Sequence, residues 1–359
     1  MRSSYHGLTI RGDALSCPLA FGLDTYYGCP YDCVHCTFLG LNAVWGHGED
    51  RALDLGWLVD MLDRGLRNEH PRSALACAIR GRKTVRVGNK YDPFPPYEDK
   101  LGIARAAIEV LLERGFQVKV ETKAVDRMLG AVTERWTPDS AIITTTIHVG
   151  LDEDWDRLEG RRVPSPARRL EVLRDFALEG YQVGVSAEPF LAGHHTVEQY
   201  GRYLDTLLEY GVHRTNVYNL RLNAFVAKRL AGAGYDIERI WAENEDGCWR
   251  VTLGHLIEAA EERGMILGCP DFVNAGRSQT RSNTCCGVDV ARPCTFNWHT
   301  WRRIGIESGL VTVEDLRLSY DGVGDLGVGL VQFLEGSQDF YTLDDTGVFT
   351  QEWSGWRLN

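Results

Sequence analysis

Short apolar runs alternate along the chain with longer stretches in which apolar residues recur every three or four positions. The first pattern is typical of buried strands and the second of amphipathic helices. The predicted strands are 23–27, 84–87, 117–121, 141–147, 182–187 and 214–218. The predicted helices include 57–67, 100–114, 167–179 and 197–210. Strands and helices that alternate in this way form βα units, so we predict an α/β fold with a parallel sheet and functional residues where strands end.

Three cysteines follow the first predicted strand at the spacing C-x3-C-x2-C. They are Cys29, Cys33 and Cys36, and His35 immediately precedes the last of them. Three thiolates can hold three irons of a [4Fe-4S] cube and leave the fourth iron open for another ligand. A zinc site completed by a distant fourth ligand is an alternative. A disulfide with a spare thiol is disfavoured, because ten cysteines without a signal peptide favour a reducing, cytoplasmic location.

Length and charge narrow the classes of function. The chain of 359 residues is long enough for one domain of about 200 residues and a smaller one. The net charge of −11 argues against an extended DNA-binding surface, because phosphate contacts need clustered Lys and Arg. The basic stretches 80–83 and 161–169 are compatible with a small phosphate-bearing substrate. No apolar run approaches the length of a membrane span, so we expect no membrane partner.

Two more motifs lie downstream of the cysteines. Residues 87–93 read V-G-N-K-Y-D-P and precede the strand that ends at Lys123, and residues 158–170 read L-E-G-R-R-V-P-S-P-A-R-R-L. Together with the cysteine motif, they resemble the radical S-adenosylmethionine (SAM) superfamily, and within it the spore photoproduct lyase-like branch, over residues 20–190. The resemblance implies a partial (β/α)6 barrel of the TIM type. It also implies a [4Fe-4S] cluster and reductive cleavage of SAM to a radical that abstracts hydrogen from a substrate.

The resemblance further implies a set of residues that bind SAM. These candidates are Gly88, Asn89, Lys123, Thr144, Thr146, Arg161, Arg162 and Glu188. The backbone at Gly88 and Asn89 would reach the SAM amino group, and Lys123 would approach its carboxylate. Arg161 or Arg162 would be a second partner of that carboxylate, because a guanidinium fork suits two oxygens.

The remaining two roles concern the nucleoside part of SAM. A hydroxyl of Thr144 or Thr146 would meet the ribose, and Glu188 would face the ribose or the adenine. For Lys123 and Glu188 the alternative is an ordinary solvated charge at the end of a strand.

The resemblance makes a nucleic-acid base or a nucleotide the first substrate class, with a small metabolite or a peptide as the second. It also implies a reducing electron donor such as flavodoxin or ferredoxin. The repair enzyme of this branch carries a hydrogen-donating cysteine where this chain has Asn89, and an amide cannot replace that thiol. Repair of thymine dimers by the same route is therefore disfavoured. A non-enzymatic iron-sulfur or zinc redox sensor is a further alternative, against which the motifs at Gly88 and Lys123 argue.

Four more cysteines lie within 26 residues of the C-terminal part, at Cys269, Cys285, Cys286 and Cys294. Gly- and Pro-containing loops surround them, so we predict a second metal centre, either an auxiliary [4Fe-4S] cluster or a structural zinc. Free buried thiols are the alternative. Neighbouring side chains usually point apart, so one of Cys285 and Cys286 would ligate while the other packs or reacts, which makes them the candidate catalytic residues. We expect a barrel at 1–220 and a C-terminal domain at 221–359 over its mouth.

Overall fold

The computed structural model describes most of the chain up to residue 268. The described residues are 6–10, 19, 21–36, 38, 51–71, 74–88, 90–159, 162–220, 222–245 and 249–268, together with three short strands further on. These strands are β9 (Val311–Thr312), β10 (Thr342–Leu343) and β11 (Val348–Thr350), and they pair antiparallel in the order β10-β11-β9.

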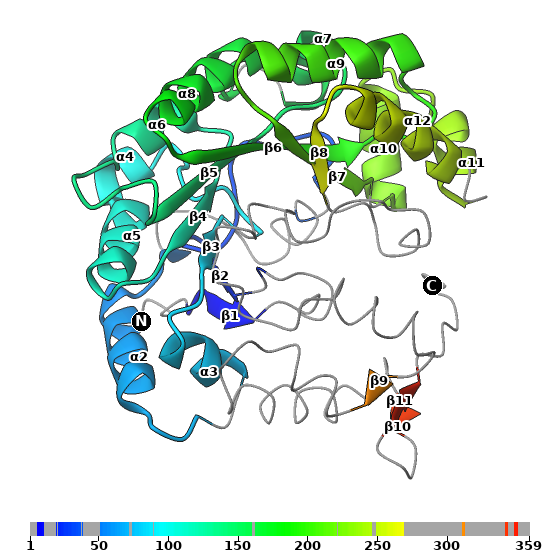
Figure 1. Ribbon diagram of the computed structural model, residues 1–359. Coiled ribbons are helices and arrows are strands. Elements are labelled where there is room, and N and C mark those ends of the chain that lie inside the picture. Colours follow the sequence, from blue (N-terminus) through cyan, green and yellow to red (C-terminus); the bar gives the residue numbers. More distant parts are fainter. Residues whose placement is uncertain are drawn as a thin grey trace.

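The main element of the described part is an eight-stranded sheet whose strands lie in the order of the sequence. The strands are β1 (Leu8–Ile10), β2 (Phe21–Leu23), β3 (Val85–Val87), β4 (Val118–Glu121), β5 (Ala141–Thr146), β6 (Gln182–Phe190), β7 (Arg214–Asn219) and β8 (Ile266–Gly268). β1 is antiparallel to β2, and every later strand is parallel to the one before it. The sheet curves into an open arc with helices along its outer side (Figure 1), which confirms the predicted α/β partial barrel.

Helices connect the successive parallel strands. They are α2 (Leu55–Arg67), α3 (Ala74–Arg80), α4 (Glu98–Leu101), α5 (Ile103–Glu113), α6 (Val125–Leu129), α7 (Asp152–Asp154), a π-helical turn (Trp155–Glu159), α8 (Pro166–Leu178), α9 (Val197–Glu209), α10 (Ala224–Gly232), α11 (Ile237–Glu245) and α12 (Trp249–Glu262). Local signals set their first turns. The side chain of Ser165 accepts the Arg168 N–H and Pro166 follows it at the start of α8, while Thr196 and Gln199 form a capping box at α9.

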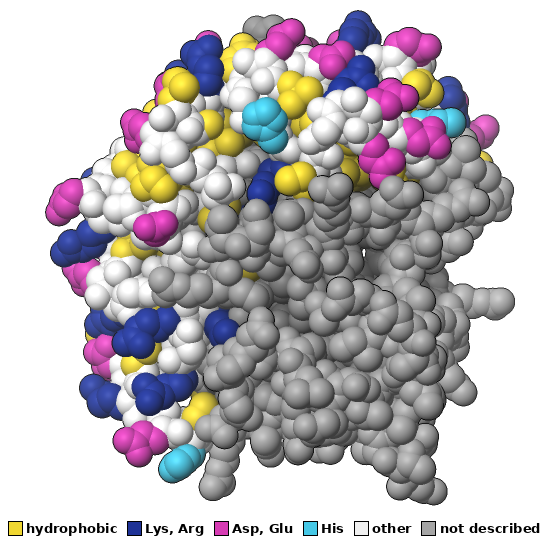
Figure 2. Space-filling view, viewed as in Figure 1, with side chains coloured by type: hydrophobic (Ala, Val, Ile, Leu, Met, Phe, Trp, Pro, Cys, Tyr) yellow, Lys and Arg dark blue, Asp and Glu magenta, His cyan; other side chains and the backbone are white. Residues whose placement is uncertain are grey.

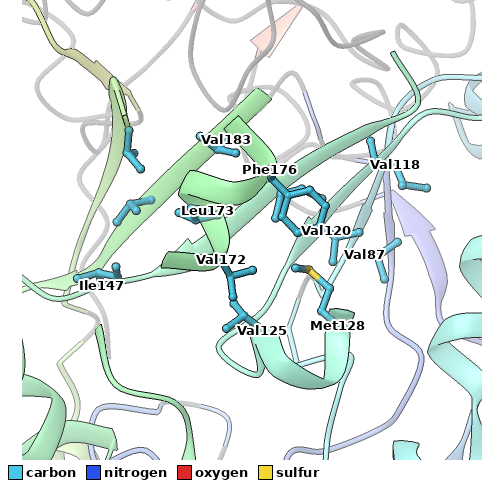
Figure 3. Packing of buried hydrophobic residues seen from close by; sticks show 14 of the residues in the cluster. Val87, Val118, Val120, Val125, Met128, Ile147, Val172, Leu173, Phe176 and Val183 are labelled. Atoms are coloured by element: carbon cyan, nitrogen blue, oxygen red, sulfur yellow. The ribbon is translucent and has the colours of Figure 1, made fainter. Parts of the chain in front are cut away.

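The two faces of the sheet differ in chemistry, because side chains alternate along a strand. Val118 and Val120 of β4 pack outward against the helices, and Figure 3 shows them with Phe176 and Met128 in the apolar core. The alternate residues of the same strand, Lys119 and Glu121, are buried as well, but on the inner face. The inner face of the arc is therefore polar and charged, whereas the outer face provides the hydrophobic core.

Two predictions of secondary structure need correction, and two strands were missed. Only Leu23 of the predicted strand 23–27 belongs to β2, because the chain leaves the sheet at Asp24, whose carboxylate accepts the N–H of Lys90 over 2.7 Å. The predicted helix 100–114 is divided into α4 and α5 at Gly102, whose φ of 62° is left-handed. The sequence also missed β1 and β8.

β8 lies beyond residue 220, where the sequence places the end of the barrel. It extends the sheet by pairing with β7, and α12 leads into it. The division into a barrel and a C-terminal domain stays a prediction.

The described surface carries charges of both signs. On the face in Figure 2, basic and acidic side chains occur side by side over the outer helices. Within the described residues, no helix has both the length and the hydropathy that a membrane span requires.

Candidate active site

The cysteine motif lies in the loop that follows β2, at the carboxyl end of the parallel strands. Cys33 is 8% exposed, Cys29 and Cys36 are partly buried, and none of the three forms a disulfide. The backbone is left-handed at Gly28 (φ 92°), just before the first cysteine, and at Asp32 (φ 55°), between the first two. Burial raises the pKa of Cys29, and it raises the pKa of Cys33 to about 11. A metal that binds these sulfurs must therefore displace protons from them.

Two distant segments hold this loop in place. Arg229 of α10 donates from Nε to the Val34 carbonyl over 3.3 Å, and from Nη2 to the carbonyl and the carboxylate of Asp32 over 3.0 and 2.9 Å. The N–H of Val34 donates to the carbonyl of Leu158 over 2.7 Å. The loop is thus fixed by side-chain and backbone bonds from elements more than a hundred residues away.

Lys123 lies against the cysteine loop. Its Nζ is 3.8 Å from Cys33 Sγ, 3.4 Å from His35 Nε2 and 2.5 Å from Glu159 Oε1. Burial alone would lower the pKa of Lys123, but the nearby Cys33 sulfur and the Glu159 carboxylate outweigh burial and raise it. The side chain is 15% exposed and charged, so it is not a solvated charge at the end of a strand.

Glu159 is the buried carboxylate at the centre of the site. It pairs with Lys123, with His148 Nε2 at 2.9 Å and with the fully buried guanidinium of Arg169. Burial alone would raise the pKa of Glu159, but the charges of Arg169 and Lys123 and the hydrogen bond with His148 hold it well below its usual value. Arg169 also donates to the carbonyls of Thr146 and Pro164, over 2.6 and 2.9 Å. Two cations against one carboxylate leave the trio of Lys123, Arg169 and Glu159 with one positive charge.

Gly88 begins the turn after β3, and its place requires glycine. Its φ is 89°, and a Cβ there would lie 2.2 Å from the carbonyl oxygen of Glu121 and 2.8 Å from Cδ of Pro93. The N–H of Gly88 donates to the carbonyl of Leu23 over 3.1 Å. The turn therefore lies directly between the ends of β2 and β4.

Asp92 ties the same turn to the start of the next loop. Its carboxylate accepts the hydroxyl of Thr122 over 2.7 Å and the N–H groups of Lys123 and Phe94 over 2.8 and 3.0 Å. The turn and the backbone of Lys123 are thus held as one unit.

The other candidate SAM contacts are more dispersed. Thr144 and Thr146 are buried on β5, and Glu188 is partly buried on β6. The Arg162 side chain is 63% exposed, and its Nη1 is 3.9 Å from Asp32 Oδ2, beside the cysteine loop. The roles of these four residues stay predictions. Asn89, Arg161, Cys269, Cys285, Cys286 and Cys294 lie outside the described residues.

Sequence reasoning missed the residues that support the site. Glu159 stands in the quoted L-E-G-R motif, and the basic stretch 161–169 contains Arg169, but neither was assigned a role. A glutamate beside a run of arginines could have indicated a buried ion pair. For Arg229, which is close to the cysteine loop only in the folded chain, the sequence holds no comparable signal.

Comparisons with known proteins give matches among solved structures only. No protein-family model and no curated protein matches the chain. Spore photoproduct lyase complexed with dinucleoside spore photoproduct is 15% identical, with a TM-score of 0.47 over 64% of this chain and 65% of that one. A mutant of that enzyme with bound AdoMet and dinucleoside spore photoproduct is 15% identical, with a TM-score of 0.46 over the same shares. The chain thus covers just under two thirds of these structures.

The close approach at Gly88 predicts the effect of a methyl group there. We expect Gly88→Ala to lower the free energy of unfolding by about 2–4 kcal/mol, since both left-handed backbone and a backbone clash oppose the new Cβ. Gly102→Ala is the matched control, because its φ of 62° is also left-handed but no atom lies within 4 Å of the new Cβ. Denaturant unfolding measures both variants, and equal losses would contradict the crowding at Gly88.

The bonds from Arg229 predict that its removal loosens the cysteine loop. In metal-free protein, Arg229→Ala should speed alkylation of the buried Cys33 thiol about tenfold, because the lost hydrogen bonds stabilise the closed loop by roughly 1–2 kcal/mol. Mass spectrometry of the labelled peptide measures the rate. The exposed neighbour Lys228→Ala is the control and should leave the rate unchanged. Equal rates in the two variants would show that Arg229 does not hold the loop.

Proposed function

We propose that the chain is a radical SAM enzyme. It binds a [4Fe-4S] cluster through Cys29, Cys33 and Cys36, binds SAM beside the cluster, and abstracts hydrogen from a substrate. One observation carries this proposal: Lys123, which the sequence motif assigns to the SAM carboxylate, lies 3.8 Å from Cys33 Sγ although 90 positions separate them. The cysteine motif and the lysine motif therefore meet at one place in the fold.

The cysteines suit a cluster better than a single zinc ion. Three thiolates can hold three irons of a [4Fe-4S] cube and leave the fourth iron open, which is the position that SAM would take. A structural zinc ion would need a fourth protein ligand beside them. When bound, the cluster supplies the electron that cleaves SAM into methionine and a 5′-deoxyadenosyl radical.

The residues around the loop suit the polar end of SAM. The Lys123 contacts to Cys33 and His35 are long, so these N–H groups can turn to a carboxylate while Glu159 keeps its ion pair. The excess positive charge of Lys123, Arg169 and Glu159 favours the same anionic group. Because the N–H of Gly88 is bonded to Leu23, its carbonyl oxygen is the group that would accept from the SAM amino group.

The inner face of the sheet favours a polar substrate. Arg86 and Lys119 both pair with Glu121, over 2.7 and 2.9 Å, and Ser186 donates to the same carboxylate over 3.2 Å. This charged lining suits a nucleotide or a modified nucleic-acid base, which is the substrate class we propose, more than an apolar metabolite. A reducing donor such as flavodoxin or ferredoxin and a cytoplasmic location complete the proposal. A protein that only senses redox state does not need a buried lysine and a glycine turn beside its cysteines. Lys123 and the Gly88 turn therefore favour an enzyme.

The proposed chemistry predicts a product that can be measured. Protein reconstituted anaerobically with iron and sulfide, then given SAM and a reductant, should form 5′-deoxyadenosine, and replacement of Cys29, Cys33 and Cys36 with Ala should abolish it. Cys77→Ala on α3 is the control and should retain both the cluster and the product. Wild-type protein that holds only zinc, or that forms no 5′-deoxyadenosine, would refute the proposed activity.

A second prediction concerns the SAM carboxylate. Lys123→Ala should weaken SAM binding about ten- to a hundredfold, because the lost charge-assisted hydrogen bond is worth about 1.5–3 kcal/mol. The iron content should not change, since Lys123 is not an iron ligand. Equilibrium titration measures the affinity, with the exposed Lys90→Ala as control. If Lys123→Ala binds SAM as tightly as Lys90→Ala, Lys123 is not part of the SAM site.

A further inference from the structure

A second group of metal-ligand side chains lies near the carboxyl ends of β5 and β6. Asp154 is the last residue of α7, which follows β5, and His194 and His195 lie between β6 and α9. Because the strands are parallel, both loops belong to the same edge of the sheet as the cysteine loop. None of these three residues contributes to the SAM site described above.

The ligand atoms of the three side chains are close together. His195 Nε2 is 2.7 Å from Asp154 Oδ2, His194 Nε2 is 3.9 Å from Asp154 Oδ1, and one ligand atom of each residue lies within 4.8 Å of the others. A tetrahedral zinc ion with bonds of about 2.1 Å to nitrogen and oxygen needs ligand atoms about 3.4 Å apart. The measured separations lie on either side of this value, so small side-chain rotations would bring the ligands into place.

The carboxylate of Asp154 is oriented by groups outside the trio. Its Oδ2 accepts the N–H of Gly150 over 3.0 Å, and its Oδ1 accepts the hydroxyl of Tyr235 over 2.8 Å. A Cβ at residue 150 would lie 2.6 Å from Oδ2, so glycine is needed there for the carboxylate to fit. Hydrogen bonds of this kind to a ligating carboxylate are typical of metal sites.

The Nε2 atoms of both histidines face the carboxylate of Asp154, so these are the nitrogens that would bind the ion. His195 is buried, and its Nδ1 has no hydrogen-bond partner among the described residues. Two imidazoles and one carboxylate are ligand types that zinc accepts.

We propose that Asp154, His194 and His195 bind one divalent transition-metal ion, with zinc as the best match to two nitrogens and one oxygen. The His194 side chain is 25% exposed, so the ion can enter from solvent and a water molecule can complete its coordination. The ion fastens the loop after β5 to the loop after β6. Through Tyr235 it also fixes the segment between α10 and α11, the part of the chain next to Arg229. None of its three ligands belongs to the proposed SAM site, so the metal proposal does not rest on the proposed function.

Cobalt(II) tests this proposal, because its spectrum distinguishes ligand types: nitrogen and oxygen ligands give visible d–d bands without the near-ultraviolet charge-transfer bands of thiolates. The full chain should bind one cobalt ion with the nitrogen and oxygen spectrum, and zinc should displace it, after replacement with Ala of all cysteines proposed as metal ligands, namely Cys29, Cys33, Cys36, Cys269, Cys285, Cys286 and Cys294. His194→Ala and His195→Ala on this background should lower that affinity at least tenfold. His213→Ala, an exposed histidine elsewhere, should not.

Thermal unfolding provides the check on folding. Zinc should raise the Tm of the parent protein and of His213→Ala, but not that of His194→Ala, whose Tm without metal should stay close to that of the parent. A cobalt spectrum of nitrogen and oxygen ligands that survives in both histidine variants would overturn the assignment. Cobalt bound only through thiolates, or a zinc effect on Tm that is equal in all variants, would overturn it as well.

Discussion

The ion pairs of the buried Glu159 are the interaction on which the geometry of the candidate active site depends. One carboxylate holds Lys123 after β4, His148 after β5 and Arg169 of α8 at a single point beside Cys33. Loss of one partner from such a buried network leaves an uncompensated charge and costs about 3–5 kcal/mol. The position of the lysine that would meet SAM is therefore set by the interior of the protein and not by the flexibility of its own side chain.

The rest of the site is built in the same way, from polar groups that connect the ends of neighbouring strands. Asp92 ties the Gly88 turn to the backbone of Lys123, and Arg229 ties α10 to the cysteine loop. These hydrogen bonds and ion pairs are directional. The apolar contacts between valines and leucines of the outer layer are not. The apolar layer makes the barrel stable, and the polar network at the strand ends decides which groups face one another.

Much of the fold could be predicted from the sequence, because period-two and helical patterns are local. The helix at 57–67 and the strand at 141–147 match α2 and β5 closely for this reason. The sequence pattern continues the first strand to residue 27, whereas in the structure Asp24 bonds to a segment 66 positions away. The apolar pattern of the helix likewise continues through Gly102, where the structure divides it. Lys123 and the cysteines were found because they belong to a motif. Glu159, Arg229 and the Asp154 cluster depend on contacts that no short sequence window contains.

The central claim is that SAM binds directly beside the cluster of Cys29, Cys33 and Cys36. Electron-nuclear double resonance on the reduced, reconstituted protein with SAM labelled at its carboxylate with oxygen-17 tests it most directly. The account predicts a hyperfine coupling between the label and the cluster, which shows the carboxylate at the open iron. A cluster spectrum that SAM leaves unchanged, with no coupling to the label, would contradict the account.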